Sequence, residues 1–292
     1  MRTLSNFISE HETDPTNCSV SPQQFIEHLG VGVMLNDETH QHFHALVKIC
    51  LYANVLRMVG LSATLDSNQK DIKELYNIIF KPNNRISNLV EYIPYINTKA
   101  ISYRLTSTRG IKYKLPQGYN HNLFEQSILR NHVLLREYVD MIKYYVEESY
   151  INRRTKGDKL LIFLANVMLC TVVSNRLKEW YPDIDVRRYV EDDPYENIIE
   201  GEITVSTNLS AGTAIDIPGL ISVIQTVSIS SLQANLQAFG RLRRIPDKEV
   251  WYYYLYTQDI PNQYKMHKDR KTIIENRSKE FVYDDYIKYL KV

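Results

Sequence analysis

Short, continuous apolar runs alternate with amphipathic segments along two stretches of the chain. An apolar run of roughly four to eight residues predicts a strand buried on both faces, and apolar residues spaced three or four apart predict a helix. Their alternation predicts an α/β fold built on a parallel sheet. The predicted strands lie at 31–35, 55–64, 159–165, 186–190, 202–207, 221–228 and 249–257. The predicted helices lie at 21–29, 168–180, 230–244 and about 262–281.

The alternation stops between about residues 85 and 155. Residues 103–122 are irregular, and the apolar residues between Phe124 and Val146 then predict one long amphipathic helix. The expected organisation therefore has three parts. Residues 1–84 form part of one α/β domain, residues 85–155 form a helical connector, and residues 156–292 form a complete second α/β domain.

Composition adds few constraints on function. The 292 residues are 44% hydrophobic and 24% charged, as in a globular protein with its own cores. The net charge of +1 excludes an overall basic field, so any nucleic acid must bind in a local groove. Cys18, Cys50 and Cys170 are scattered and predict reduced thiols in a cytoplasmic protein. No apolar run reaches membrane-spanning length, and residues 1–12 lack the apolar core of a signal peptide.

Two carboxylates, Asp37 and Glu38, directly follow the first predicted strand. Ligands of open α/β sheets bind outside the carboxyl ends of the strands, so both acids are expected to face a crevice. There, one carboxylate can hold Mg²⁺ on a nucleotide and its neighbour can orient or deprotonate a water molecule. Two solvated acids in a turn at the end of a strand remain the alternative.

Other polar residues near these acids offer further chemistry. His40, His42 and His44 would share one face of an extended strand and could bind zinc with Glu38. On a helix they would point in different directions. At the end of the next predicted strand, Ser62 and Thr64 could contact Asp37 or His40, or they could simply cap a helix.

The polar loop at 206–220, "STNLSAGTAIDIPGL", connects two predicted buried strands. Thr207, Ser210 and Gly212 expose hydroxyl groups and backbone amides that suit phosphate groups. Asp216 precedes a Pro-Gly turn into the next strand. An ordinary connecting loop is the alternative.

The stretch "QAFGRLRR" at 237–244 lies in the predicted helix 230–244. On a helix, Gln237, Gly240, Arg241 and Arg244 would share one face. Guanidinium groups that point into a cleft can neutralise charge on a phosphoryl group in transfer. A solvated basic face is the alternative.

The motifs "DETH", "SAT", "STNLSAGTAIDIP" and "QAFGRLRR" follow one another in this order, each near the end of a predicted strand. The ordered set resembles motifs II, III, V and VI of the superfamily 2 helicases, the DExH-type ATP-dependent nucleic-acid translocases. "KLLIFLANV" at 159–167 is similar to motif IV. Among these enzymes, the chain looks most like the phage-type helicases of recombination and repair. The resemblance implies RecA-like domains of the P-loop NTPase type, and cytoplasmic localisation (in the host, if the chain is phage-encoded).

The resemblance also implies a role for each matching residue of the first domain. Asp37 would coordinate the Mg²⁺ bound with ATP, and Glu38 would be the catalytic base for water. His40, together with Ser62 and Thr64, would couple the two domains.

In the second domain, four residues would contact the nucleotide: Asp216, Gln237, Arg241 and Arg244. Arg241 and Arg244 would be the arginine fingers, and Thr207 with Asn208 would bind the nucleic-acid backbone. Gly212 would also lie at the nucleotide, but its spacing to Asp216 is longer than the G-x-D of motif V, which leaves its role in doubt.

One element of this family is absent from the sequence. The phosphate-binding loop GxxxxGK[ST] holds the β- and γ-phosphates, yet the chain contains no Gly-Lys dipeptide and only 36 residues precede Asp37. The expectation is therefore the C-terminal part of an ATP-dependent DNA helicase of recombination, repair or replication, with RNA as the alternative substrate. It would bind ATP and Mg²⁺ between its domains and need a separate N-terminal fragment for hydrolysis. The alternatives are a non-catalytic nucleic-acid-binding module and a histidine-based metalloenzyme.

Overall fold

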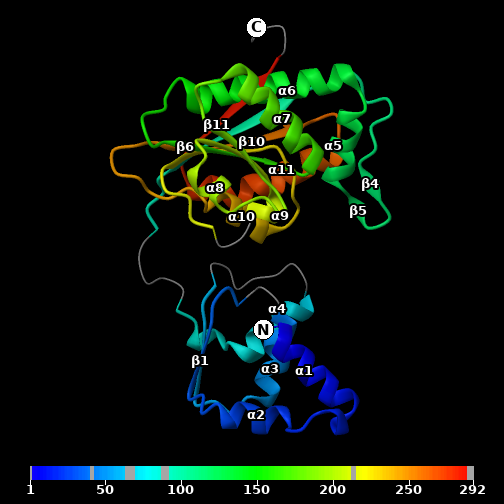
Figure 1. Ribbon diagram of the computed structural model, residues 1–292, viewed down its shortest axis with the longest axis vertical. Helices are drawn as coiled ribbons and strands as arrows, with labels where there is room; N and C mark the ends of the chain where they lie inside the picture. The colour runs from blue at the N-terminus through cyan, green and yellow to red at the C-terminus, as the bar shows by residue number, and fades with distance from the viewer. Residues whose placement is uncertain (1, 40–42, 63–69, 87–91, 212–214, 288–292) are drawn as a thin grey trace. The chain divides into compact units, whose positions relative to one another are not determined.

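The computed structural model divides into two compact units, Met1–Glu91 and Tyr92–Val292 (Figure 1). The structure describes residues 2–39, 43–62, 70–86, 92–211 and 215–287, and each unit is considered by itself. Among the described helices, none has the length and hydropathy needed to cross a bilayer.

The described residues of the first unit form four α-helices and a sheet of two parallel strands. Its elements are α1 (Arg2–Thr13), η1 (Pro15–Asn17), α2 (Pro22–His28), β1 (Val33–Asn36), α3 (Phe43–Tyr52), β2 (Arg57–Gly60), α4 (Lys70–Ile79) and η2 (Pro82–Asn84). The helix predicted at 21–29 is confirmed as α2, where Ser21 and Gln24 form a reciprocal capping box. A small core joins α3 to α4, with the rings of Phe43 and Tyr76 4.2 Å apart.

The second unit is built on a seven-stranded parallel sheet in the order β11-β3-β10-β9-β6-β8-β7. Its strands are β3 (Ile96–Tyr103), β6 (Lys159–Leu164), β7 (Val186–Tyr189), β8 (Ile203–Thr207), β9 (Leu220–Gln225), β10 (Val250–Thr257) and β11 (Ser278–Tyr286). A small hairpin, β4 (Lys114–Leu115) with β5 (Gly118–Tyr119), lies apart from this sheet. The helices of the second unit are α5 (His121–Leu129), α6 (His132–Val146), η3 (Glu147–Ile151), α7 (Val167–Trp180), α8 (Glu196–Glu200), α9 (Asn208–Ala211), α10 (Leu232–Phe239), α11 (Pro261–Ile274) and η4 (Glu275–Arg277). The predicted parallel α/β fold is confirmed.

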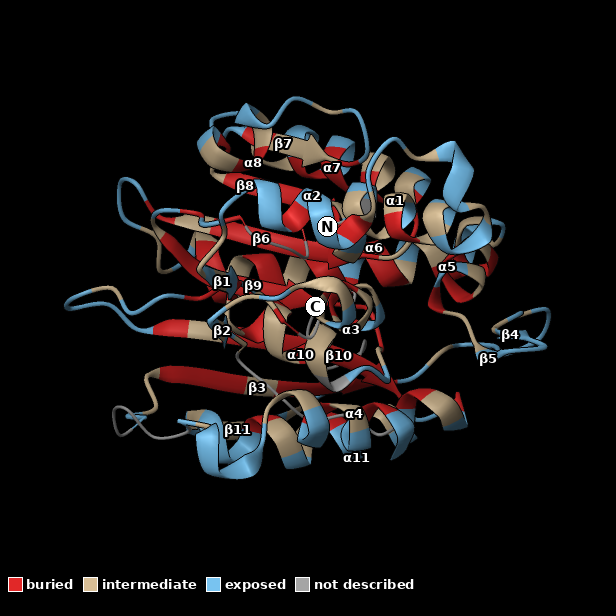
Figure 2. Cartoon of the chain, turned by 90° about the horizontal axis from the view of Figure 1, so that it is seen from below, coloured by how far each residue is buried: buried red, intermediate tan, exposed pale blue. Residues whose placement is uncertain are grey.

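Helices cover both faces of this sheet, so its central strands are buried, whereas the edge strand β11 is partly exposed (Figures 1 and 2). Alternate residues of β6 belong to different cores: Leu160 and Ile162 pack towards α6 and α7, and Leu161 and Phe163 pack towards α8 and α10. This double burial explains why the central strands are continuous apolar runs in the sequence.

The segment 85–155 differs from the expected connector. Its strand β3 lies within the sheet of the second unit, and its helices α5 and α6 cover one face of that sheet. The predicted long helix is two helices, because Asn131 caps the start of α6 with its side chain. The helix predicted at about 262–281 ends at Ile274, and the chain then forms the edge strand β11.

Candidate nucleotide and nucleic-acid sites

In the first unit, the two motif-bearing segments extend side by side beyond the ends of β1 and β2. The Leu61 amide donates to the Asn36 carbonyl oxygen (2.8 Å), and the Thr39 amide donates to the Leu61 carbonyl oxygen (2.9 Å). The acidic pair that follows Asn36 therefore lies beside Ser62, as the parallel arrangement of the strands predicts.

The backbone at the acidic pair is strained. Glu38 has φ of +49°, which is rare for a residue other than glycine and is concentrated at functional sites. The Asp37 Oδ1 atom accepts a hydrogen bond from the Glu38 amide (2.9 Å), and the Asp37 side chain is exposed. An exposed carboxylate at the end of a strand fits Mg²⁺ that arrives with phosphate groups, because Mg²⁺ is commonly held by one or two carboxylates plus phosphates and waters.

Several predicted residues lie outside the described residues, namely His40, His42, Thr64 and Gly212. His44 is described: it is exposed in the first turn of α3. The extended strand that a three-histidine zinc site requires is therefore not present at His44. Within the described ranges, no three His, Cys, Asp or Glu side chains gather into a metal-binding group.

The prediction that "QAFGRLRR" lies on one helix is wrong. Helix α10 ends at Phe239, and Gly240 is its C-cap, with its amide donating to the Leu236 carbonyl oxygen (2.8 Å). A glycine at the end of a helix, followed by Pro246, favours termination. Gln237 is half-buried in the last turn of α10, whereas Arg241 and Arg244 follow the helix, so these residues do not form a single helical stripe.

The turn after α10 returns to the amino end of the sheet, where the loop before β9 also lies. The Arg241 side chain is buried, and its Nη1 atom donates to the Ile215 carbonyl oxygen. Asp216 is exposed, and its Oδ1 atom lies 3.5 Å from Nε of Arg243. Arg243 was not predicted, because a helical arrangement places it off the arginine face.

Arg244 is exposed beside an open hollow of about 650 Å³ at the same end of the sheet. Tyr95, Lys248 and Lys279 also line this hollow. The Tyr95 hydroxyl donates to the Leu242 carbonyl oxygen (3.1 Å). This bond connects the arginine turn, residues 241–244, to the start of β3. Arg244 makes no hydrogen bond or ion pair within the described residues, so its guanidinium group can reach an external anion.

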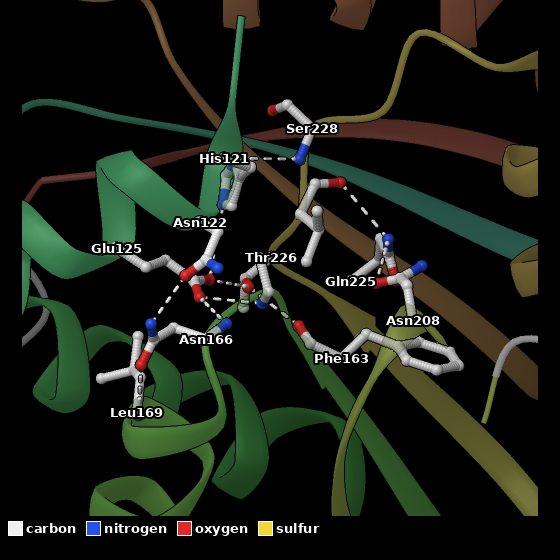
Figure 3. Close-up of polar contacts among 12 residues, drawn as sticks. His121, Asn122, Glu125, Phe163, Asn166, Leu169, Asn208, Gln225, Thr226 and Ser228 are labelled. Atoms are coloured by element: carbon white, nitrogen blue, oxygen red, sulfur yellow. Dashed lines mark hydrogen bonds and ion pairs between the residues drawn. The ribbon is translucent and has the colours of Figure 1, made fainter. Parts of the chain in front are cut away.

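The opposite, carboxyl end of the same sheet carries a cluster of carboxamides (Figure 3). Asn166 caps α7 and donates through Nδ2 to Asn122 Oδ1 (2.6 Å). Asn208 follows β8, and its Oδ1 atom accepts from Gln225 Nε2 (3.2 Å). Thr207, the last residue of β8, shares a hydrogen bond with the Ser210 hydroxyl (2.9 Å). Amide and hydroxyl groups of this kind suit the phosphates and sugars of a nucleic-acid backbone.

A buried carboxylate organises this end of the sheet. Glu125 of α5 has no exposed surface and accepts hydrogen bonds from the backbone amides of Ala165 (2.8 Å) and Asn166 (2.7 Å) (Figure 3). The Thr226 hydroxyl donates to it (3.3 Å), and His121 Nε2 lies 3.4 Å away. Glu125 thus joins α5 to the ends of β6 and β9. The sequence gives no signal for this, because the groups that Glu125 binds are far along the chain.

Comparison with known proteins bears on the fold. No protein-family model matches the chain, and no curated protein matches it. Among solved structures, the chain is similar to S. cerevisiae Dbp5 L327V bound to RNA and ADP BeF3, with 13% identity and a TM-score of 0.52 over 87% of this chain and 59% of that one. It is also similar to Mss116p bound to ssRNA and AMP-PNP, with 17% identity and a TM-score of 0.51 over 89% of this chain and 49% of that one.

These similarities show the fold. The chain has a RecA-like α/β fold and spans less than two thirds of each of these two neighbours.

Proposed function

We propose that the chain is part of a DExH-type ATP-dependent helicase or translocase of superfamily 2. The observation that carries the proposal is the distribution of motifs in the second unit. The arginine turn and Asp216 lie at the amino end of the sheet, and Thr207 with Asn208 lies at the carboxyl end. One rigid sheet would thus connect a nucleotide-binding edge to a nucleic-acid-binding edge.

Each unit carries residues with a role in the proposed chemistry of the nucleotide. Asp37 would hold Mg²⁺ on ATP, and Glu38 would accept a proton from the attacking water. Asp216 and Gln237 would contact the nucleotide, and Arg244 with Arg241 would neutralise charge on the transferring phosphoryl group. Arg241 would first have to leave the Ile215 carbonyl oxygen that it binds here.

At the other edge, Thr207 and Asn208 would bind the phosphate backbone of DNA or RNA. Such contacts carry no sequence information and weaken as salt concentration rises. Changes in the units' grip on the backbone during ATP binding and hydrolysis would then move the protein along a strand. We propose that this activity serves DNA recombination, repair or replication in the cytoplasm.

An exposed apolar face of the first unit favours a further polypeptide partner. Four apolar side chains share one face of its sheet and are exposed: Val33 (59%), Leu35 (63%), Val59 (42%) and Leu61 (48%). Parallel sheets are normally covered on both faces. A segment that packs here and carries a GxxxxGK[ST] loop would complete the nucleotide site.

The proposal is tested with a single-stranded oligonucleotide, as DNA and as RNA, and with a fluorescent ATP analogue plus Mg²⁺. Asn208→Ala should weaken oligonucleotide binding, and Arg244→Ala should weaken analogue binding about tenfold while oligonucleotide binding is retained. Arg176→Ala, on the exposed surface of α7, is the matched control. Absence of both interactions in the unaltered chain would contradict the proposal.

A non-catalytic nucleic-acid-binding module is the second candidate. It is favoured by the buried position of Arg241, whose guanidinium group bonds to the protein's own backbone. This candidate predicts oligonucleotide binding that ATP analogues do not change. It also predicts no effect of Glu38→Gln on ATP hydrolysis once a segment with a phosphate-binding loop is supplied.

A further inference from the structure

A short basic hairpin stands out from the second unit at the carboxyl end of its sheet (Figures 1 and 2). It comprises residues 109–119, between β3 and α5, and contains the two short strands β4 and β5. We call these residues the basic arm. They include three exposed cations, Arg109, Lys112 and Lys114. The sequence has no Asp or Glu between residues 103 and 124, so the arm concentrates positive charge in a chain whose net charge is only +1.

The base of the basic arm is fixed to the rest of the second unit. The Lys112 amide donates to the Ser127 hydroxyl of α5 (2.9 Å), and Gln263 Nε2 of α11 donates to the Tyr119 hydroxyl (2.9 Å). The rings of Tyr113 and Tyr119 lie 6.2 Å apart and pack against the core beneath α5 and α6. The arm is therefore held in place before any ligand arrives, which lowers the entropic cost of binding one.

The three cations of the basic arm are available to an external anion. Within the described ranges, none of their side chains forms an ion pair with a carboxylate of the protein, and Lys114 Nζ lies 5.5 Å from the centre of the Tyr113 ring. Arg104, which precedes the arm, differs because it is bound to Asp259 (2.7 Å). The arm thus presents three positive charges that the described part of the protein does not neutralise.

The chemistry of the basic arm favours the phosphate backbone of a nucleic acid. Its two tyrosines, Tyr113 and Tyr119, anchor the arm to the core, so the exposed groups are cations and not stacking platforms for bases. Cations bind phosphates without regard to sequence. A duplex carries about one negative charge per 1.7 Å of its axis, twice the density of a single strand. Three cations on one hairpin therefore suit a duplex better than a single strand.

The basic arm also adjoins the residues proposed to bind a single strand. Asn122, in the first turn of α5, accepts a hydrogen bond from Asn166 Nδ2 (2.6 Å) and so belongs to the carboxamide cluster (Figure 3). The Ser228 amide donates to His121 Nδ1 (3.2 Å), which joins the start of α5 to the segment after β9. The arm leads directly into α5, so arm and cluster lie at the same end of the sheet.

We propose that the basic arm binds the phosphate backbone of a duplex that adjoins the single strand held at Thr207 and Asn208. The preferred ligand is then a duplex with a single-stranded tail, and not a single strand or a blunt duplex alone. The inference rests on the function proposed above, because the tail occupies the proposed strand site. It adds the duplex and the residues that hold it.

Fluorescence anisotropy with the full chain tests this with three DNA probes: a single strand, a blunt duplex and the same duplex with a single-stranded tail. The triple variant Arg109→Gln, Lys112→Gln and Lys114→Gln should bind the tailed duplex at least about tenfold more weakly. The slope of log K against log salt concentration should become less steep by about 2 to 3, since each phosphate contact contributes about 0.9. Binding of the single strand should change less than twofold. The charge-conserving variant, with Lys at 109 and Arg at 112 and 114, should keep the tight binding and the steep slope.

A matched control removes the same charge from other exposed positions of the second unit. Lys156→Gln, Arg176→Gln and Lys178→Gln are combined in one chain, in the loop before β6 and on α7. This variant should bind all three probes like the unaltered chain. A loss as large as that of the arm variant would show that net charge alone sets the affinity, and would overturn the proposal.

The remaining outcomes separate the arm from the strand site. Equal binding of the tailed duplex by the neutral arm variant and the unaltered chain would overturn the arm and keep the proposed function. An equal loss for the single strand and the tailed duplex would also overturn the proposal, because the arm would then hold the strand. Displacement of the tailed duplex by polyglutamate of equal charge would assign the arm to an acidic polypeptide instead.

Absence of single-strand binding by the unaltered chain would contradict the proposed function without deciding the arm. The blunt duplex then decides it. Loss of blunt-duplex binding in the neutral arm variant would support a duplex on the arm, and unchanged binding would overturn it.

Discussion

Two of the sheets in the described residues, β1-β2 of the first unit and the seven-stranded sheet of the second, contain the same kind of strand in opposite surroundings. Both are parallel, and both carry motif residues at the carboxyl ends of their strands. In the second unit, the five inner strands of the sheet are covered by helices on both faces. In the first unit, two strands expose one apolar face, with Leu35 63% exposed against 0% for Leu161 of β6.

This difference indicates which unit is stable by itself. A parallel pair of strands buries little surface, and at least three strands or a covering layer are needed for independent stability. The second unit meets this requirement with its own residues. The first unit instead relies on the small core between α3 and α4, because its sheet leaves Leu35 and its neighbours exposed.

The strongest test compares one substitution in the two sheets. Leu161→Ala in β6 should lower the free energy of unfolding by about 2–5 kcal/mol, because it leaves a cavity in a packed core. Leu35→Ala in β1 should cost less than about 0.5 kcal/mol, because the side chain is exposed. Both tryptophans, Trp180 and Trp251, lie in the second unit, so their fluorescence in a urea titration isolates its unfolding.

The first unit contains no tryptophan, and far-UV circular dichroism with hydrogen exchange of β1 amides would report on Leu35→Ala. A cost above about 2 kcal/mol for this variant would break the comparison. It would mean that the exposed face is covered in solution.

Gly60, at the end of β2, is a tightly packed position of the first unit. A Cβ atom there would lie 2.7 Å from Phe80 Cζ and 2.8 Å from Thr39 Oγ1. Gly60→Ala should therefore cost about 1–3 kcal/mol through overpacking. It should also increase hydrogen exchange at the Thr39 amide, which bonds to the Leu61 carbonyl oxygen.

Gly32→Ala is the matched control, because no atom lies within 4 Å of the added Cβ. If the two variants exchanged alike, the close packing between the acidic segment and β2 would not exist in solution.

The sequence predicts strands well where burial on both faces makes them apolar. The central strands β6, β8, β9 and β10 all appear as apolar runs. Strand β3 does not, because Thr98, Lys99 and Ser102 interrupt the pattern. Their polar groups are satisfied by partners distant in sequence: the Thr98 and Ser278 hydroxyls lie 2.6 Å apart, and Lys99 pairs with Glu148 (2.5 Å). Such long-range pairs leave no local pattern.

The candidate site, too, could be predicted from the sequence in one part and not in another. The sequence places Asp37, Glu38 and Ser62 at neighbouring strand ends, and the structure brings their segments together because strand order determines it. The arginine stretch fails as a helix, because Gly240 ends α10 before Arg241. The roles assigned to these residues remain predictions.

The smallest expected effect concerns His267 of α11, a buried titratable group in the second unit. Its ring stacks on Tyr256 with centroids 3.8 Å apart, and its Nδ1 atom lies 3.0 Å from the Tyr254 hydroxyl. Burial, together with Arg270, Lys271 and Lys268, lowers the pKa of His267 from 6.5 to about 4.

The unfolded chain therefore binds a proton at His267 between pH 6.5 and pH 4 that the folded chain does not. The contribution of neutral His267 to the free energy of unfolding is therefore complete above about pH 6.5 and is lost as the pH falls towards 4. The loss amounts to about 1 kcal/mol between pH 7 and pH 5.5. Urea titrations followed by tryptophan fluorescence at the two pH values measure this loss. His267→Gln should remove that part of the pH dependence, and the same change at the exposed His28 should not. An unchanged slope in His267→Gln would show that the ring is solvated and that this part of the second unit is as open as the sheet of the first.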